Sequence, residues 1–138
     1  MHLSIFTDEL GLDITKGLPV LQSWGLEHVD LRGRVFGMAA ESLPADRLPE
    51  LKALLDDYGM QVGCLQSSLA KVHLPDDERC RSEEIKLEGI IRAADALGCR
   101  LVRSFFYWQP PKDLAGELAV RPDEQQKVLD RFAPLAPP

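Results

Sequence analysis

The chain of 138 residues is 45% hydrophobic and 28% charged, with a net charge of −6 and a pI of about 5.0. This acidic balance argues against a protein whose main task is to grip nucleic-acid phosphates. No apolar run approaches the roughly 20 residues that cross a bilayer, and the start lacks the marks of a signal peptide. We therefore expect a cytoplasmic protein with no nucleic-acid and no membrane partner.

The apolar spacing then predicts four strands and four helices in alternation. Asp13 is a candidate N-cap of the first helix, and Glu83 falls in the first turn of the third, where the helix dipole favours anions. A long polar loop over 67–81, of a length that is often functional, precedes that third helix. We expect strands over about 3–7, 28–31, 61–66 and 101–106, and helices over about 13–24, 45–58, 82–97 and 122–133.

Three glycines set the period of this pattern. Gly25, Gly59 and Gly98 each end a helix pattern and lead into a strand pattern, with spacings of 34 and 39 residues. That is the length of one βα unit. Four units are half of a (β/α)8 barrel, which usually needs roughly 250 residues. The sequence therefore predicts an α/β fold, a half barrel of four parallel βα units that occupies 1–138 as a single partial domain.

No fifth strand pattern follows the fourth helix pattern, which runs into prolines at 134, 137 and 138. We expect either the first half of a longer enzyme, cut short or split between genes, or a half barrel that self-associates. Exposed sheet edges and an uncovered inner face would favour pairing with a second half barrel or with a second copy.

In parallel βα folds the chemistry gathers at the carboxyl ends of the strands. Carboxylates, guanidinium groups, hydroxyls and aromatic rings would suit a polyol or sugar pocket, but any barrel mouth is polar, and a generic solvated rim remains the alternative. The candidates at these ends are Asp8, Glu9, Asp30, Arg32, Ser67, His73, Arg103 and Trp108.

Several of these candidates also have a structural interpretation. Asp30 and Arg32 alternate on one strand, so they share a face and are either an ion pair or ligand contacts. Arg103 needs a carboxylate partner inside a barrel, and Asp30 is a candidate. Asp8 and Glu9 are adjacent, so at most one is expected to point into a site.

Metal-binding and nucleophile motifs are weak in this sequence. The segment from His73 to Cys80 fits no tight zinc or calcium spacing. Cys64, Cys80 and Cys99 form no C-x-x-C and fit buried thiols in a reducing compartment. We therefore predict no metal site in this chain and name no catalytic residue.

Four segments carry a family resemblance. Ile5-Phe-Thr-Asp-Glu9, Val29-Asp-Leu-Arg-Gly33, the run from Leu54 to Val62 and the run from Ala93 to Arg103 are similar, in order and spacing, to the first half of the xylose-isomerase-like barrels. This superfamily includes sugar phosphate isomerases and epimerases, inosose dehydratases and type IV endonucleases.

The resemblance implies a metal-dependent isomerase or epimerase of a sugar or sugar phosphate. In such enzymes Mn²⁺, Mg²⁺ or Co²⁺ holds neighbouring substrate oxygens, and two carboxylates move a proton through an enediolate. The ligands and carboxylates of the sugar-acting members come from strands 5 to 8, so none maps onto this chain, and we expect no metal in the chain alone and no turnover. What the resemblance implies here is a substrate wall made of Phe6, Arg32, Cys64, Ser67, Arg103 and Trp108.

Overall fold

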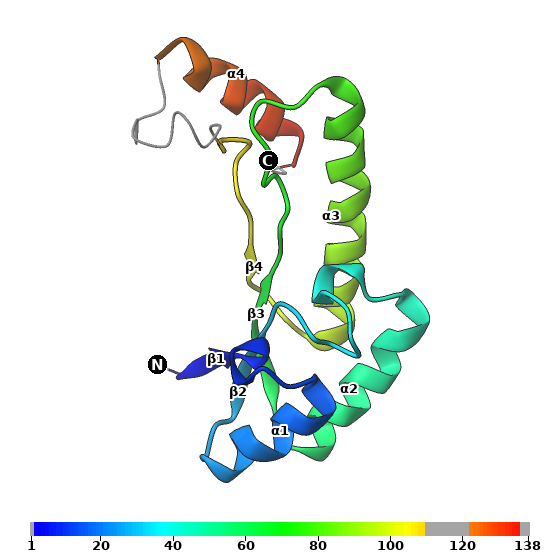
Figure 1. Ribbon diagram of the computed structural model, residues 1–138. Coiled ribbons are helices and arrows are strands. Elements are labelled where there is room, and N and C mark those ends of the chain that lie inside the picture. The colour runs from blue at the N-terminus through cyan, green and yellow to red at the C-terminus, as the bar shows by residue number, and fades with distance from the viewer. Residues whose placement is uncertain (1, 110–121, 136–138) are drawn as a thin grey trace. The chain divides into compact units, whose positions relative to one another are not determined.

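A computed structural model describes residues 2–109 and 122–135 (Figure 1). Four parallel strands form one sheet in the order β1-β2-β3-β4, and helices alternate with them along the chain. This arrangement confirms the predicted half barrel of four βα units. The strands are β1 (Ser4–Phe6), β2 (His28–Leu31), β3 (Gln61–Gln66) and β4 (Val102–Arg103), and the helices are α1 (Ile14–Ser23), α2 (Leu48–Asp57), α3 (Asp77–Leu97) and α4 (Pro122–Phe132).

The contacts divide the chain into two compact units. The first consists of Met1–Ser67 and Glu88–Arg103 and holds the whole sheet with α1 and α2. The second consists of Ser68–Leu87 and Ser104–Pro138. The single partial domain over 1–138 stays a prediction. No helix in residues 2–109 and 122–135 has the length and apolar character needed to cross a bilayer.

The core of the first unit lies between the sheet and its helices. Val29 and Leu31 of β2 are completely buried, as are Leu18 of α1 and Leu51 of α2. Side chains alternate between the two faces of a strand, so the apolar residues of β2 turn to the helices while His28 and Asp30 lie on the opposite face. The first helix begins as expected, because Asp13 accepts a hydrogen bond from the Thr15 amide at 3.2 Å.

The third helix begins five residues earlier than the sequence predicts, at Asp77 rather than near 82. The Asp76 carboxylate accepts a hydrogen bond from the Arg79 amide at 2.8 Å and so caps the helix there. The polar loop after β3 is correspondingly shorter, and Glu83 lies in the second turn of the helix instead of the first.

The fourth strand is shorter than expected, since β4 covers only Val102–Arg103 instead of 101–106. Pairing continues past it, because the Phe105 and Tyr107 amides donate to the carbonyls of Leu69 and Ala70, both at 2.9 Å. Ala70 and Tyr107 have φ values of 57° and 58°, a left-handed conformation outside strand geometry. The backbone is therefore paired beyond β4 without forming a strand.

Candidate functional site

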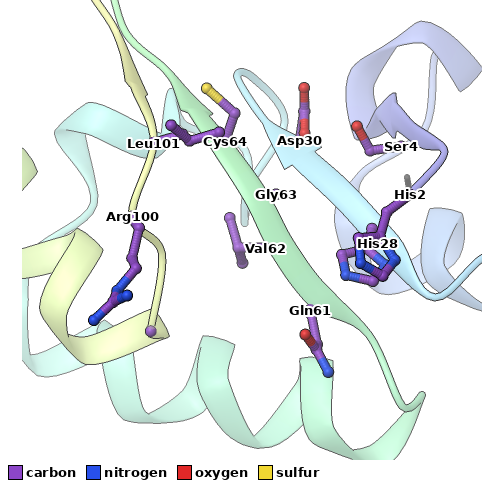
Figure 2. A pocket seen from close by; sticks show the side chains of 11 residues that line it. His2, Ser4, His28, Asp30, Gln61, Val62, Gly63, Cys64, Arg100 and Leu101 are labelled. Carbon is purple, nitrogen blue, oxygen red and sulfur yellow. The ribbon is translucent and has the colours of Figure 1, made fainter.

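The sheet face opposite the helices is polar and hollowed. A groove of about 570 Å³ runs along it, and its walls include Ser4, Asp30 and Cys64 from three neighbouring strands (Figure 2). The His2 and His28 rings stack in the same groove, with centroids 4.2 Å apart. Branched aliphatic side chains dominate the interior of most such barrels, so small and polar residues on this face leave room for a polar occupant.

Asp30 sits on this face because Gly63 makes space for it. Val29 pairs with Val62 but Asp30 pairs with Cys64, so Gly63 is an extra residue that forms a bulge. A Cβ at Gly63 would lie 2.9 Å from Asp30 Oδ1. The Gln66 side-chain amide donates to Asp30 Oδ2 at 3.1 Å. Burial, and then the nearby Asp30 charge, raise the pKa of the Cys64 thiol, which keeps it protonated near neutral pH.

Arg32 joins the carboxyl ends of β1 and β2. Its Nε lies 2.9 Å from Asp8 Oδ2, its Nη2 lies 2.6 Å from Glu9 Oε1, and its guanidinium carbon is 4.7 Å from the centre of the Phe6 ring. The hydrogen bonds that Arg32 donates to Asp8 and Glu9 raise its pKa above the usual value. The guanidinium group is thus a clamp between two carboxylates.

This clamp corrects two expectations. Arg32 pairs with Asp8 and Glu9 rather than with Asp30, and Asp8 and Glu9 reach the same partner instead of facing opposite ways. The reason is that Thr7–Leu10 is a turn of 3-10 helix, so the alternation of a strand has already ended at Phe6.

Asp8 is also constrained on its other side. A Cβ at Gly33 would lie 3.0 Å from Asp8 Oδ2, so a glycine there lets the carboxylate approach the backbone closely. Asp8 Oδ1 is buried and has no hydrogen-bond partner among the described residues. In this arrangement Asp8 holds Arg32 through Oδ2.

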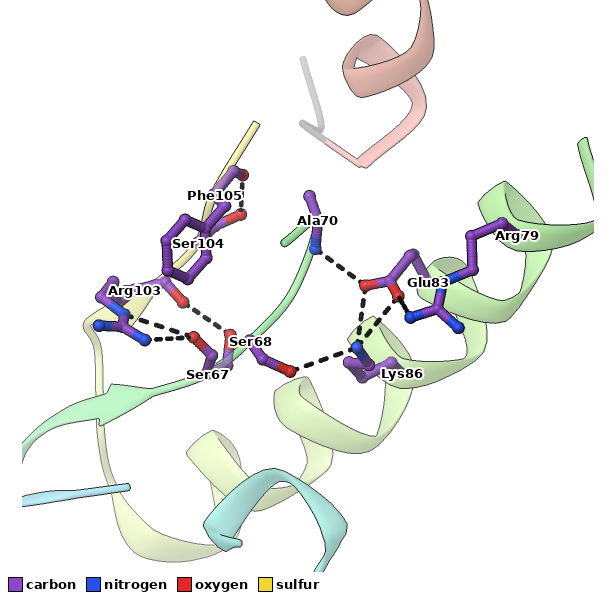
Figure 3. Close-up of polar contacts among 9 residues, drawn as sticks. All are labelled: Ser67, Ser68, Ala70, Arg79, Glu83, Lys86, Arg103, Ser104 and Phe105. Atoms are coloured by element: carbon purple, nitrogen blue, oxygen red, sulfur yellow. Dashed lines mark hydrogen bonds and ion pairs between the residues drawn. The ribbon is translucent and has the colours of Figure 1, made fainter. Parts of the chain in front are cut away.

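Ser67 and Arg103 join the ends of β3 and β4 (Figure 3). The Ser67 hydroxyl donates to the Arg103 carbonyl at 2.6 Å, and the Arg103 guanidinium group donates to the Ser67 carbonyl at 3.0 and 3.3 Å. Ser67 is only 2% exposed, so its hydroxyl holds the wall together and does not face solvent. Among the described residues Arg103 forms no ion pair with the candidate partner Asp30, whose carboxylate accepts a hydrogen bond from Gln66.

His73 and Trp108 belong to the second unit. Their rings meet edge to face with centroids 4.8 Å apart, and His73 Nε2 lies 3.7 Å from Glu124 Oε1. His73 Nδ1 is buried and finds no hydrogen-bond partner within residues 2–109 and 122–135. The other seven predicted site residues, Phe6, Asp8, Asp30, Arg32, Cys64, Ser67 and Arg103, lie in the first unit.

The polar centre of the second unit is the fully buried Glu83, which is not among the predicted site residues (Figure 3). Its carboxylate accepts a hydrogen bond from the Ala70 amide at 2.8 Å, and the Lys86 ammonium lies 3.0 Å from both of its oxygens. Arg79 lies 3.3 Å from Glu83 on its outer side. Arg79, Glu83 and Lys86 are spaced by four and then three positions in the sequence. This spacing places them on one face of a helix and could have indicated the cluster.

A resident metal does not fit the residues that the structure describes. No group of three or more His, Cys, Asp or Glu side chains comes together among them. Two carboxylates of the sheet already have hydrogen-bond donors: Asp8 accepts from Arg32, and Asp30 accepts from Gln66. The expectation that this half carries no metal ligands stays a prediction.

Comparison with known proteins supports the fold through structure alone. No family model and no curated protein matches the sequence. A xylose isomerase-like TIM barrel protein from Mycobacterium smegmatis, solved with magnesium, superposes with a TM-score of 0.66 at 14% identity, covering 97% of this chain and 50% of its own. The D-psicose 3-epimerase of Clostridium cellulolyticum H10, solved with D-tagatose, superposes with a TM-score of 0.68 at 12% identity. The match covers 98% of this chain and 47% of that one.

The probable 3-DHS dehydratase AsbF of Bacillus anthracis gives a TM-score of 0.67 at 16% identity, and the match covers 98% of this chain and 47% of that one. The chain therefore spans about half the length of the solved proteins it matches. The match extends over nearly all of its residues and agrees with the four parallel βα units. The chain has the fold of half a TIM barrel.

Proposed function

We propose that this chain supplies the N-terminal half of a metal-dependent sugar or sugar phosphate isomerase or epimerase. The observation that carries the proposal is the rim at the carboxyl ends of the four strands, where two clamps, Arg32 with Asp8 and Glu9, and Arg103 with Ser67, tie neighbouring strands together. The matched proteins include a D-psicose 3-epimerase solved with a sugar and a barrel protein solved with magnesium.

In this proposal the described residues bind and orient substrate and do not transfer the proton. Phe6 offers a ring face to sugar C–H groups, and the exposed parts of Arg32 and Glu9 offer polar contacts to hydroxyl groups. A divalent metal, Mn²⁺, Mg²⁺ or Co²⁺, would polarise substrate oxygens and make the neighbouring C–H acidic. Its ligands and the acid–base carboxylates are assigned to a second half barrel.

The test is the coding sequence that follows residue 138. We expect it to encode four more βα units with Glu, Asp, His and Glu at strand ends, and we expect the extended protein to interconvert sugar isomers or epimers when Mn²⁺ is added. The matched control is the extended protein with the first of those glutamates changed to glutamine, which should keep its fold and lose turnover. A downstream sequence without such strands would contradict the proposal.

A second candidate is a non-catalytic half barrel that pairs with a second copy. The observation that favours it is apolar exposure at both sheet edges, where Leu3 beside β1 is 77% exposed and Leu101 beside β4 is 64% exposed. Large apolar side chains on an unpaired edge favour association.

A further inference from the structure

Asp30 places a carboxylate on the face of the sheet that a completed barrel would enclose. Its Oδ2 accepts a hydrogen bond from the Gln66 side-chain amide at 3.1 Å. A Cβ at Gly63 would lie 2.9 Å from its Oδ1, so the carboxylate lies close against the backbone of β3. Among the residues that the structure places, no Lys or Arg forms an ion pair with Asp30.

The arginines on and beside the strands have other contacts. Arg32 is held by the two carboxylates of its clamp, and Arg103 donates to the Ser67 carbonyl. Arg100 lines the same groove as Asp30, but its side chain points away from that carboxylate (Figure 2). A cation that pairs with Asp30 therefore comes from outside the described ranges of the chain.

The surroundings of Asp30 leave room for a long side chain. Ser4, Gly63 and Cys64 line the groove beside it, and all three are small. The groove has a volume of about 570 Å³, whereas branched aliphatic side chains fill the interior of most such barrels. A carboxylate that is enclosed without an opposite charge is strongly unfavourable. A barrel that closes over this groove therefore needs a cation in it.

Barrel geometry indicates which strands could supply that cation. The interior side chains of a (β/α)8 barrel pack in layers, and the four members of a layer come from alternate strands. In a completed barrel Asp30 of β2 shares its layer with β4 and with the sixth and eighth strands. Asp30 is paired with Cys64. Leu65 is paired with Val102, so the residue of β4 at this level is the apolar Leu101, which lines the same groove.

We propose that the second half barrel places a Lys or Arg side chain from the sixth or eighth strand against Asp30; this rests on the proposed function above. The cation enters the space over Ser4, Gly63 and Cys64 and replaces solvent around the carboxylate. The pair then joins the two halves and favours a partner with the matching charge over one whose interior is apolar at this level. Asp30 is in this role an assembly contact.

The coding sequence after residue 138 and one substitution test this pairing. We expect a Lys or Arg at an inward position of the sixth or eighth strand. Asp30→Asn should lower the folding equilibrium constant of the extended protein by about 10-fold or more, because it leaves that cation enclosed without a partner. In the 138-residue chain, where no second half covers the groove, the same substitution should change the constant by about 2-fold at most. Urea unfolding measures both constants.

Two further variants complete the test. Asp57→Asn removes an exposed carboxylate at the end of α2 and should have a small effect in both proteins. Replacing the partner cation with Met in the Asp30→Asn background should cost less than the sum of the two single changes. Single effects that simply add would contradict the pairing.

The outcomes separate this inference from the proposed function. An extended protein that interconverts sugars with Mn²⁺ but has no inward Lys or Arg on the sixth or eighth strand overturns the pair and leaves the function standing. An Asp30→Asn effect that is equally small in the extended protein and in the 138-residue chain does the same. A downstream sequence without further βα units overturns both.

Discussion

Replacing Glu83 with alanine is expected to lower the free energy of unfolding by about 2–4 kcal/mol. The side chain is fully buried and is the acceptor for the Ala70 amide. Its loss leaves that amide without a partner and leaves Lys86, whose side chain is 24% exposed, beside an empty space. Arg79 is half exposed and can turn to solvent, which limits the cost. Urea unfolding measures the change.

Two matched variants define the origin of this effect. Glu84→Ala removes the neighbouring exposed carboxylate and should change stability by about 0.5 kcal/mol at most. Glu83→Gln keeps an oxygen for the Ala70 amide and should cost less than the alanine variant. Hydrogen exchange at the Ala70 amide should speed up in Glu83→Ala. An unchanged Ala70 exchange rate together with unchanged stability would show that the carboxylate does not hold this loop.

Between pH 10 and pH 12 the protein is expected to lose about 2–3 kcal/mol of stability through Tyr107. Burial, and then the nearby Cys80, Glu83 and Glu84, raise the pKa of its phenol to about 12. The folded-state pKa lies above the unfolded value near 10. The stability that the neutral phenol contributes is therefore fully present below about pH 10 and is lost as the pH rises to about 12. The folded state would otherwise have to bury a phenolate.

Tyr107→Phe is the control for this pH dependence. The Tyr107 hydroxyl is buried and has no hydrogen-bond partner in the part of the chain that the structure describes, so its removal should leave stability at pH 7 unchanged or raise it by up to about 1 kcal/mol. Unfolding of the two proteins is compared at several pH values, which cancels titrations common to both. If native and variant stabilities fall in parallel from pH 10 to 12, the phenol is not buried in the native protein.

The alternation of elements could be predicted from the sequence because its signals are local. Gly25, Gly59 and Gly98 have φ values of 76°, 64° and 66°. This is the left-handed conformation in which many helices end. The Asp13 cap is also local, since its partner lies two residues away. These patterns depend on near neighbours in the chain, so periodicity and turn chemistry reveal them.

The geometry of the rim could not be predicted in the same way. The Arg32 clamp depends on Thr7–Leu10 turning into a 3-10 helix, which brings two adjacent carboxylates to one cation. Beyond β4, Ala70 and Tyr107 adopt a left-handed conformation, for which their residue types have no preference. Tertiary contacts hold them there, among them the hydrogen bond from the Ala70 amide to Glu83.

Calorimetric titration of the 138-residue chain with Mn²⁺ tests most directly the claim that this half provides walls and the other half provides the metal centre. We expect no stoichiometric site tighter than about 10 μM, which corresponds to roughly −7 kcal/mol, because Asp8 and Asp30 are held by Arg32 and Gln66. A tight one-to-one site that Asp8→Asn or Asp30→Asn abolishes would contradict the account, since the metal centre would then lie in this half.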